Sequence, residues 1–179
     1  EMYGIVLYDL FTEWLSADGV SDKSADAAWN LMKNLPNTSK KEVVEYFYSD
    51  NSGELIQAAE HLGWPHGTST PGRPSTNGLA ERMVRKVKEG TRAALAPTGL
   101  SADFWPYALR HYVMSHNFIG RGRGSPSPWT LRFKRKIPQK LQLLPFGARV
   151  GYKPVPVTGR RTDVWDVATL EGIFLGWHM

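Results

Sequence analysis

The chain has 179 residues, 41% of them hydrophobic, which is enough to bury one core and a small appendage. It has no cysteine, which excludes disulfide bonds and thiolate metal sites. No apolar run reaches the length of a membrane span and no secretory signal is visible, so we expect an intracellular protein, nuclear or cytoplasmic, without a membrane partner.

The charge is divided unevenly along the sequence. Residues 1–60 carry 11 acidic and 4 basic side chains, a net charge of −7, whereas residues 61–179 carry 6 acidic and 18 basic side chains, a net charge of +12. A basic segment of this density favours a polyanionic partner, and nucleic acid is the usual one. An ordinary solvated surface rich in Lys and Arg has the same balance, so the charge alone leaves both interpretations open.

The first 70 residues predict short strands that alternate with helices. Four apolar runs predict strands, at residues 4–8, 14–17, 43–48 and 64–67. Two helices are predicted between them, at residues 24–35 and 55–62. Ser24 can cap the first helix and Gly63 can end the second. Residues 68–77 then form a loop rich in turn-forming residues.

The second half begins with the most regular helical pattern, over residues 78–96. Its apolar side chains recur on one side of the helix, at Leu79, Met83, Val87 and Ala94. Charged side chains form a stripe on the opposite side, at Glu81, Arg85, Lys88 and Arg92. Ser101 predicts the start of a second helix over residues 102–117.

The remaining residues change in character. Residues 120–140 are basic and rich in Gly and Pro, which predicts a linker with one helical turn at 129–133. Short β segments follow, at residues 148–152, 164–167 and 172–177. They resemble the beginning of a small β-barrel, so the order of elements favours an α/β core followed by a minor β unit.

Two acidic residues stand where the predicted elements meet. Asp50 ends an apolar strand and opens a turn, and Glu81 lies just inside the helix that follows the Pro/Gly loop. This placement can bring distant carboxylates together around a divalent metal, and the basic helix face beside Glu81 points to phosphodiester chemistry on nucleic acid. Two simpler interpretations stay open: ordinary turn chemistry at Asp50, and a surface ion pair between Glu81 and Arg85.

Two sequence blocks resemble the catalytic core of retroviral and copia-type retrotransposon integrases. They are Ser-Asp-Asn-Ser-Gly-Glu-Leu at residues 49–55 and Pro-Gly-Arg-Pro-Ser-Thr-Asn-Gly-Leu-Ala-Glu-Arg at residues 71–82. Further matches lie at 104–108, 116–117, 144–147 and 172–176. The resemblance implies a ribonuclease H-like mixed sheet flanked by helices, with a small C-terminal β-barrel-like segment. It divides the chain into a catalytic core at 1–119, a basic linker at 120–142 and a partial barrel at 143–179, within a longer polyprotein.

The resemblance also implies roles for particular residues. Asp50 and Glu81 match the second and third acids of the family's catalytic Asp-Asp-Glu triad, which binds two Mg²⁺ or Mn²⁺ ions for DNA strand transfer. The DNA-binding residues implied by the resemblance are Asn77, Arg85 and Lys88, and Arg73 of the loop and Arg92 of the charged helix stripe are expected to bind DNA as well. The implied partners are the retroelement DNA ends and the target duplex, and the full-length protein is expected to form a homo-oligomer.

The chain departs from the family pattern at the first acid. In the family this Asp lies on a strand before the hairpin that residues 5–17 resemble, so it falls upstream of Glu1, and Asp9 is the nearest substitute. We therefore expect the chain to be inactive alone, and we expect strands 4–8 and 43–48 to leave an empty place between them or to pair abnormally. The alternatives are a non-catalytic DNA-binding remnant and a structure-specific nuclease of the same fold. All five histidines are interpreted as packing or surface residues.

Overall fold

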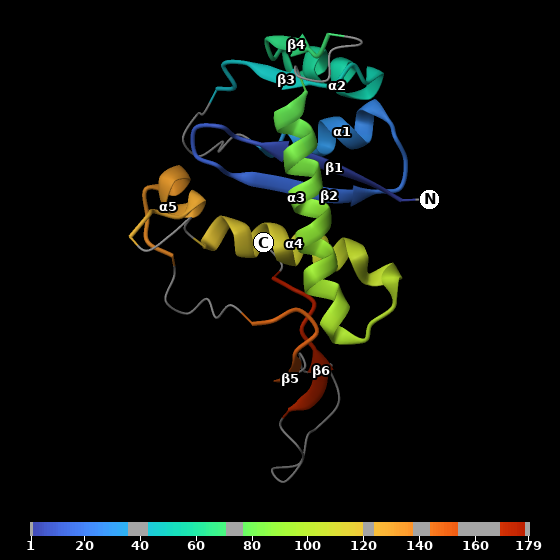
Figure 1. The fold of residues 1–179 in the computed structure, drawn as a ribbon, viewed down its shortest axis with the longest axis vertical. Coiled ribbons are helices and arrows are strands. Elements are labelled where there is room, and N and C mark those ends of the chain that lie inside the picture. The colour runs from blue at the N-terminus through green and yellow to red at the C-terminus, as the bar shows by residue number, and fades with distance from the viewer. Residues whose placement is uncertain are drawn as a thin grey trace, which may run out of the picture.

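The structure is a computed structural model that describes residues 2–35, 43–70, 77–119, 124–137, 144–153 and 169–177. Figure 1 shows a mixed arrangement in which helices lie around short strands. The elements in chain order are β1 (Tyr3–Tyr8), β2 (Leu15–Val20), α1 (Ala25–Met32), β3 (Phe47–Ser49), α2 (Gly53–Leu62), β4 (His66–Thr68), α3 (Gly78–Leu95), η3 (Ala96–Thr98), η4 (Ala102–Phe104), α4 (Trp105–Phe118), α5 (Pro128–Phe133), β5 (Arg149–Tyr152) and β6 (Leu170–Ile173). Among the described residues, no helix combines the length and the apolar character that crossing a membrane requires.

The described strands form three separate pairs. β1 and β2 are antiparallel, with Tyr3 opposite Val20 and Tyr8 opposite Leu15. β3 and β4 are parallel, and β5 and β6 are antiparallel. Within the described part of the chain β1 and β3 are not hydrogen-bonded to each other, and the empty place expected between them stays a prediction.

One core lies between β1, β3 and the helices α1 and α2. Its buried residues are Leu7, Ala28, Met32, Ala58 and Ala59, and Phe47 of β3 packs against them. The caps of the two helices are those that the sequence predicts. The Ser24 hydroxyl accepts a hydrogen bond from the Ala27 amide at 3.2 Å, and Gly63 ends α2 with a φ of 67°, which glycine adopts without steric cost.

A second core lies between β2 and the helices α3 and α4. It contains Leu15, Ala17, Val87, Leu109 and Val113. Alternate residues of β1 enter the two cores, because Leu7 belongs to the first while Val6 and Tyr8 pack against the second. The hairpin β1–β2 is therefore covered by α1 and α2 on one face and by α3 and α4 on the other.

A buried amide fastens α4 to the edge of β2. Asn117 is 1% exposed; its side-chain nitrogen donates to the Leu15 carbonyl at 2.7 Å, and its oxygen accepts from the Leu15 amide at 2.9 Å. These two bonds satisfy backbone groups of β2 that no described strand pairs on that side.

The predicted strand at 43–48 is mostly wrong. Only Phe47–Ser49 is a strand, and Val43 and Tyr46 are 83% and 63% exposed. A strand requires a hydrogen-bonded neighbour, and the only partner that the structure describes for this segment is the three-residue β4. Leu79, which was expected on the apolar face of its helix, is 44% exposed because the first turn of α3 extends beyond the core.

Two C-terminal predictions also change. The helix expected from residue 102 begins with the 3-10 turn η4, and α4 follows with Pro106 in its first turn. The strand expected at 172–177 lies instead at Leu170–Ile173, and the one expected at 164–167 falls outside the described residues. β5 and β6 form one antiparallel pair, so the barrel itself and the three domain boundaries stay predictions.

The short helix α5 packs on the core, although it lies within the stretch predicted as a basic linker. Trp129 packs against Phe118 and Trp14, with ring centroids 5.1 and 6.3 Å away. Arg132 is 6% exposed, its guanidinium lies 4.9 Å from the Trp14 ring, and it donates a hydrogen bond to the Leu35 carbonyl. This basic side chain therefore fixes α5 in place and is not part of a solvated surface.

Candidate functional site

Asp50 follows the last residue of β3 and its side chain is exposed. Phe47 packs against the core made by α1 and α2, and Ser49 is 5% exposed. Since side chains alternate along a strand, Tyr48 and Asp50 point to the opposite side of β3. The fold thus presents the Asp50 carboxylate to solvent at the carboxyl end of a strand.

Glu81 lies in the first turn of α3 and is also exposed. α3 begins at Gly78, after Asn77, whose carbonyl accepts the first helical hydrogen bond from the Glu81 amide at 3.1 Å. A carboxylate in the first turn is favoured by the positive end of the helix dipole. In Figure 1, α3 begins at the level of β3 and β4 and runs past β1 and β2.

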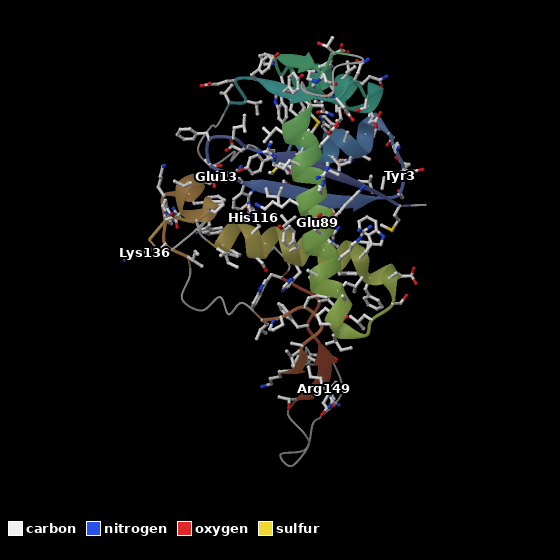
Figure 2. The ribbon with its side chains drawn as sticks, viewed as in Figure 1. Tyr3, Glu13, Glu89, His116, Lys136 and Arg149 are labelled. Atoms are coloured by element: carbon white, nitrogen blue, oxygen red, sulfur yellow. The ribbon has the colours of Figure 1, made fainter. Side chains whose placement is uncertain are left out.

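The side chains of the charged stripe predicted on α3 lie together and line one shallow depression on the surface of the helix. It is lined by Glu81, Val84, Arg85, Lys88, Glu89 and Arg92. All the charged members are exposed, and within the described residues no ion pair joins Glu81 to Arg85. Figure 2 shows Glu89 on α3. The structure therefore brings Glu81 together with three cations on one exposed helix face.

Other predicted site residues have different surroundings. Asp9 is engaged in the β1–β2 turn, where its carboxylate accepts hydrogen bonds from the amides of Phe11 and Thr12 at 3.0 and 3.3 Å and from the Thr12 hydroxyl. Asn77 is half-buried, and Arg73 falls outside the described residues. In the ranges that the structure describes, no three His, Asp or Glu side chains gather into a group that could hold a metal ion.

The sequence and the fold were compared with known proteins. No family model matches the sequence. The chain is 32% identical over 190 residues to the retrovirus-related Pol polyprotein from transposon RE1 of Arabidopsis thaliana, covering 99% of this chain and 12% of the relative. It is 30% identical over 111 residues to the corresponding polyprotein from transposon RE2 of the same plant, covering 60% of this chain and 8% of the relative. The chain thus spans a small part of the curated relatives that it matches.

Two solved structures resemble the fold. The catalytic core domain of BIV integrase has a TM-score of 0.54 at 19% identity and covers 73% of this chain and 85% of its own. The simian T-cell lymphotropic virus intasome in complex with PP2A regulatory subunit B56 gamma has a TM-score of 0.58 at 18% identity, with 95% and 60% covered. The chain is similar to a segment of retrotransposon Pol polyproteins. Its mixed α/β fold is that of an integrase catalytic core.

Three histidines of this chain are packing residues, as the sequence predicts. His61 packs edge-on against Trp29 with ring centroids 5.4 Å apart, and His111 Nε2 lies 2.8 Å from the Leu144 carbonyl. Figure 2 shows His116 on α4, and its Nε2 lies 3.3 Å from the Glu13 carbonyl.

Sequence reasoning missed the fourth histidine of the chain. His66 Nε2 lies 2.9 Å from the hydroxyl of Ser49, the residue directly before Asp50. The only signal for this contact is the parallel register of β3 and β4, which places Phe47 opposite His66 and Ser49 opposite Thr68. No spacing in the sequence specifies that register.

Proposed function

We propose that this segment carries part of the active site for DNA strand transfer, in a ribonuclease H-like core over residues 1–119. Asp50 and Glu81 are the proposed metal-binding carboxylates, and Arg85, Lys88 and Arg92 the proposed contacts to the DNA backbone. The observation that supports this most is the α3 surface, where an exposed carboxylate lies at one end of an exposed cationic stripe.

The donor set suits Mg²⁺ or Mn²⁺. Carboxylate oxygens are the hard ligands that these ions prefer, and Mg²⁺ sites commonly combine one or two carboxylates with substrate phosphates. Asp50 and Glu81 are both exposed, so neither is prevented by packing from meeting an ion. When bound, the ions would activate the attacking oxygen and stabilise charge on the leaving oxygen.

The chain's own side chains have two tasks in this proposal. Asp50 and Glu81 hold metal, and the positive helix end and nearby cations reduce the repulsion between the two carboxylates. Arg85, Lys88 and Arg92 bind phosphates along α3, and the guanidinium groups can do so with two hydrogen bonds each. Asn77 and Arg73, which precede Glu81 in the sequence, are proposed as further DNA contacts.

A third carboxylate is proposed to come from outside the described residues. Asp9 is unsuited to the role, because its oxygens already accept hydrogen bonds within the hairpin turn. We also propose that the isolated chain is inactive in strand transfer. Residues 120–142 and 143–179 are proposed as linker and partial barrel, and the full-length protein as a homo-oligomer.

The test uses a longer integrase that contains this chain, in a strand-transfer assay with labelled DNA ends. Asp50→Asn and Glu81→Gln should each abolish the product, while Glu89→Gln should leave it. Glu89 is the matched control, because it is exposed on the same helix and lines the same depression as Glu81. Equal activity of the Glu81 and Glu89 variants would contradict the assignment. Strand transfer by the isolated chain would contradict only the proposed inactivity.

A DNA-binding remnant is the second candidate, supported by the same cationic stripe, which needs no metal to attract phosphate. The two candidates differ in metal dependence. The remnant would bind DNA equally with and without Mg²⁺, whereas a metal-binding active site should bind DNA more tightly when Mg²⁺ is present.

A further inference from the structure

We infer that His66 is a positioning residue for Asp50. It acts through Ser49 and fixes the end of β3 that carries the carboxylate. The inference rests on the proposed metal-binding role of Asp50, and the experiment below separates the two.

His66 is linked to the backbone of Asp50 by two hydrogen bonds that share the Ser49 hydroxyl. The Ser49 hydroxyl donates to the Asp50 carbonyl at 2.6 Å and lies 2.9 Å from His66 Nε2. A hydroxyl has a single proton, so the second bond must be donated by the histidine. His66 therefore carries a proton on Nε2, and the Ser49 oxygen accepts it.

Packing holds the His66 ring in this orientation. The ring stacks on Phe47, its neighbour across β3 and β4, with centroids 5.1 Å apart and planes at 26°. Phe47 in turn packs edge-on against Trp64 at 5.8 Å and against the first core. Ser49 is 5% exposed, so water competes little for its hydroxyl. A ring anchored in the core thus directs one donor at the residue that precedes the carboxylate.

Asp50 needs such a restraint because the regular strand stops at Ser49. The last backbone bond at this end of the pair runs from the Ser69 amide to the Ser49 carbonyl at 3.0 Å. Beyond it, the bond from the Ser49 hydroxyl to the Asp50 carbonyl sets the peptide plane after Asp50. That plane limits rotation about the Asp50 Cα and hence the direction of its side chain. α2 begins three residues later at Gly53, so the turn is held at both ends.

Mn²⁺ titration followed by NMR tests the inference on the chain itself. Bound Mn²⁺ broadens nearby amide signals, so the Mn²⁺ concentration that half-broadens the signals of residues 50–53 measures binding at Asp50. His66→Phe keeps the aromatic packing and removes the donor, Ser49→Ala removes the hydroxyl, and His66→Gln restores a side-chain N–H. We expect the first two to raise the half-broadening concentration about tenfold and His66→Gln to stay within about twofold of the wild type, as for other residues that orient metal ligands.

Asp50→Asn separates the inference from the proposed function. If Asp50→Asn abolishes the broadening and His66→Phe leaves it unchanged, the inference is overturned and the metal role of Asp50 stands. If Asp50→Asn changes nothing, both are overturned. A loss in His66→Gln equal to that in His66→Phe also overturns the inference, because the restored donor would then have no effect. Should His66→Phe fail to fold, Ser49→Ala decides, since it leaves the stacked rings in place.

Discussion

The cationic face of α3 makes a quantitative prediction about salt. A protein that neutralises DNA phosphates releases counterions. The logarithm of its binding constant for DNA therefore falls linearly with the logarithm of the salt concentration, with a slope of about 0.9 per phosphate contact. Arg85, Lys88 and Arg92 line one depression and all are exposed, which allows each to contact a phosphate. Replacing all three by Ala should therefore reduce the slope by about 2.7.

The assay is fluorescence anisotropy with labelled duplex DNA. Between about 50 and about 200 mM salt, a slope difference of about 2.7 means that the wild type loses about 40-fold more affinity than the triple variant. The control variant replaces Lys134, Arg135 and Lys136 by Ala. These three side chains are exposed and directly follow α5, and their replacement removes the same charge as the α3 variant does. If the control changes the slope as much as the α3 variant does, or if the α3 variant changes it by less than about 1, the assignment of these cations to DNA is refuted.

Three further predictions concern stability. Asn117→Ala leaves the amide and the carbonyl of Leu15 unpaired, which should lower the free energy of unfolding by about 3 kcal/mol and the melting temperature by about 9 °C. The control Asn30→Ala, at an exposed position, should change the melting temperature little. Equal shifts in melting temperature for the two variants would contradict this explanation. A Cβ at Gly90 would lie 2.1 Å from the Tyr112 ring, so Gly90→Ala should destabilise the chain in urea unfolding, whereas Gly78→Ala, which meets nothing, should not do so by steric clash. Burial, helped by the charge of Glu89, raises the pKa of Tyr112. The contribution of Tyr112 to stability is therefore complete below the ordinary tyrosine pKa and is lost as the pH rises through the raised pKa. Tyr112→Phe should flatten this alkaline fall in the free energy of unfolding, and an unchanged pH profile would contradict the assignment.

The helices were predictable from the sequence because their signals are local. Ser24, Gly63 and Ser101 act within one turn of the helix ends that they specify, and the period of apolar residues fixed the buried side of α3 around Val87. The strand over Phe47–Ser49 was overextended because its length depends on a partner from a distant part of the sequence.

The candidate site was predictable only in part, for the same reason. The positions of Asp50 and Glu81 at element ends, and the stripe that contains Arg85, follow from short-range pattern. The contact of His66 with Ser49 depends on the strand register. The sequence places Arg132 in a basic linker, because nothing nearby in the sequence shows that it packs on Trp14.

The bond from Arg132 to the Leu35 carbonyl also constrains the order of folding. It joins residues 97 positions apart, and the aromatic rings around it come from the hairpin turn and from α4. During synthesis, the contacts that Arg132 and Trp129 make with Leu35 and Trp14 can form only after α5 has left the ribosome. Until then the Trp14 ring is not packed against Trp129 and Phe133, so the nascent chain exposes apolar surface that is packed in the folded protein.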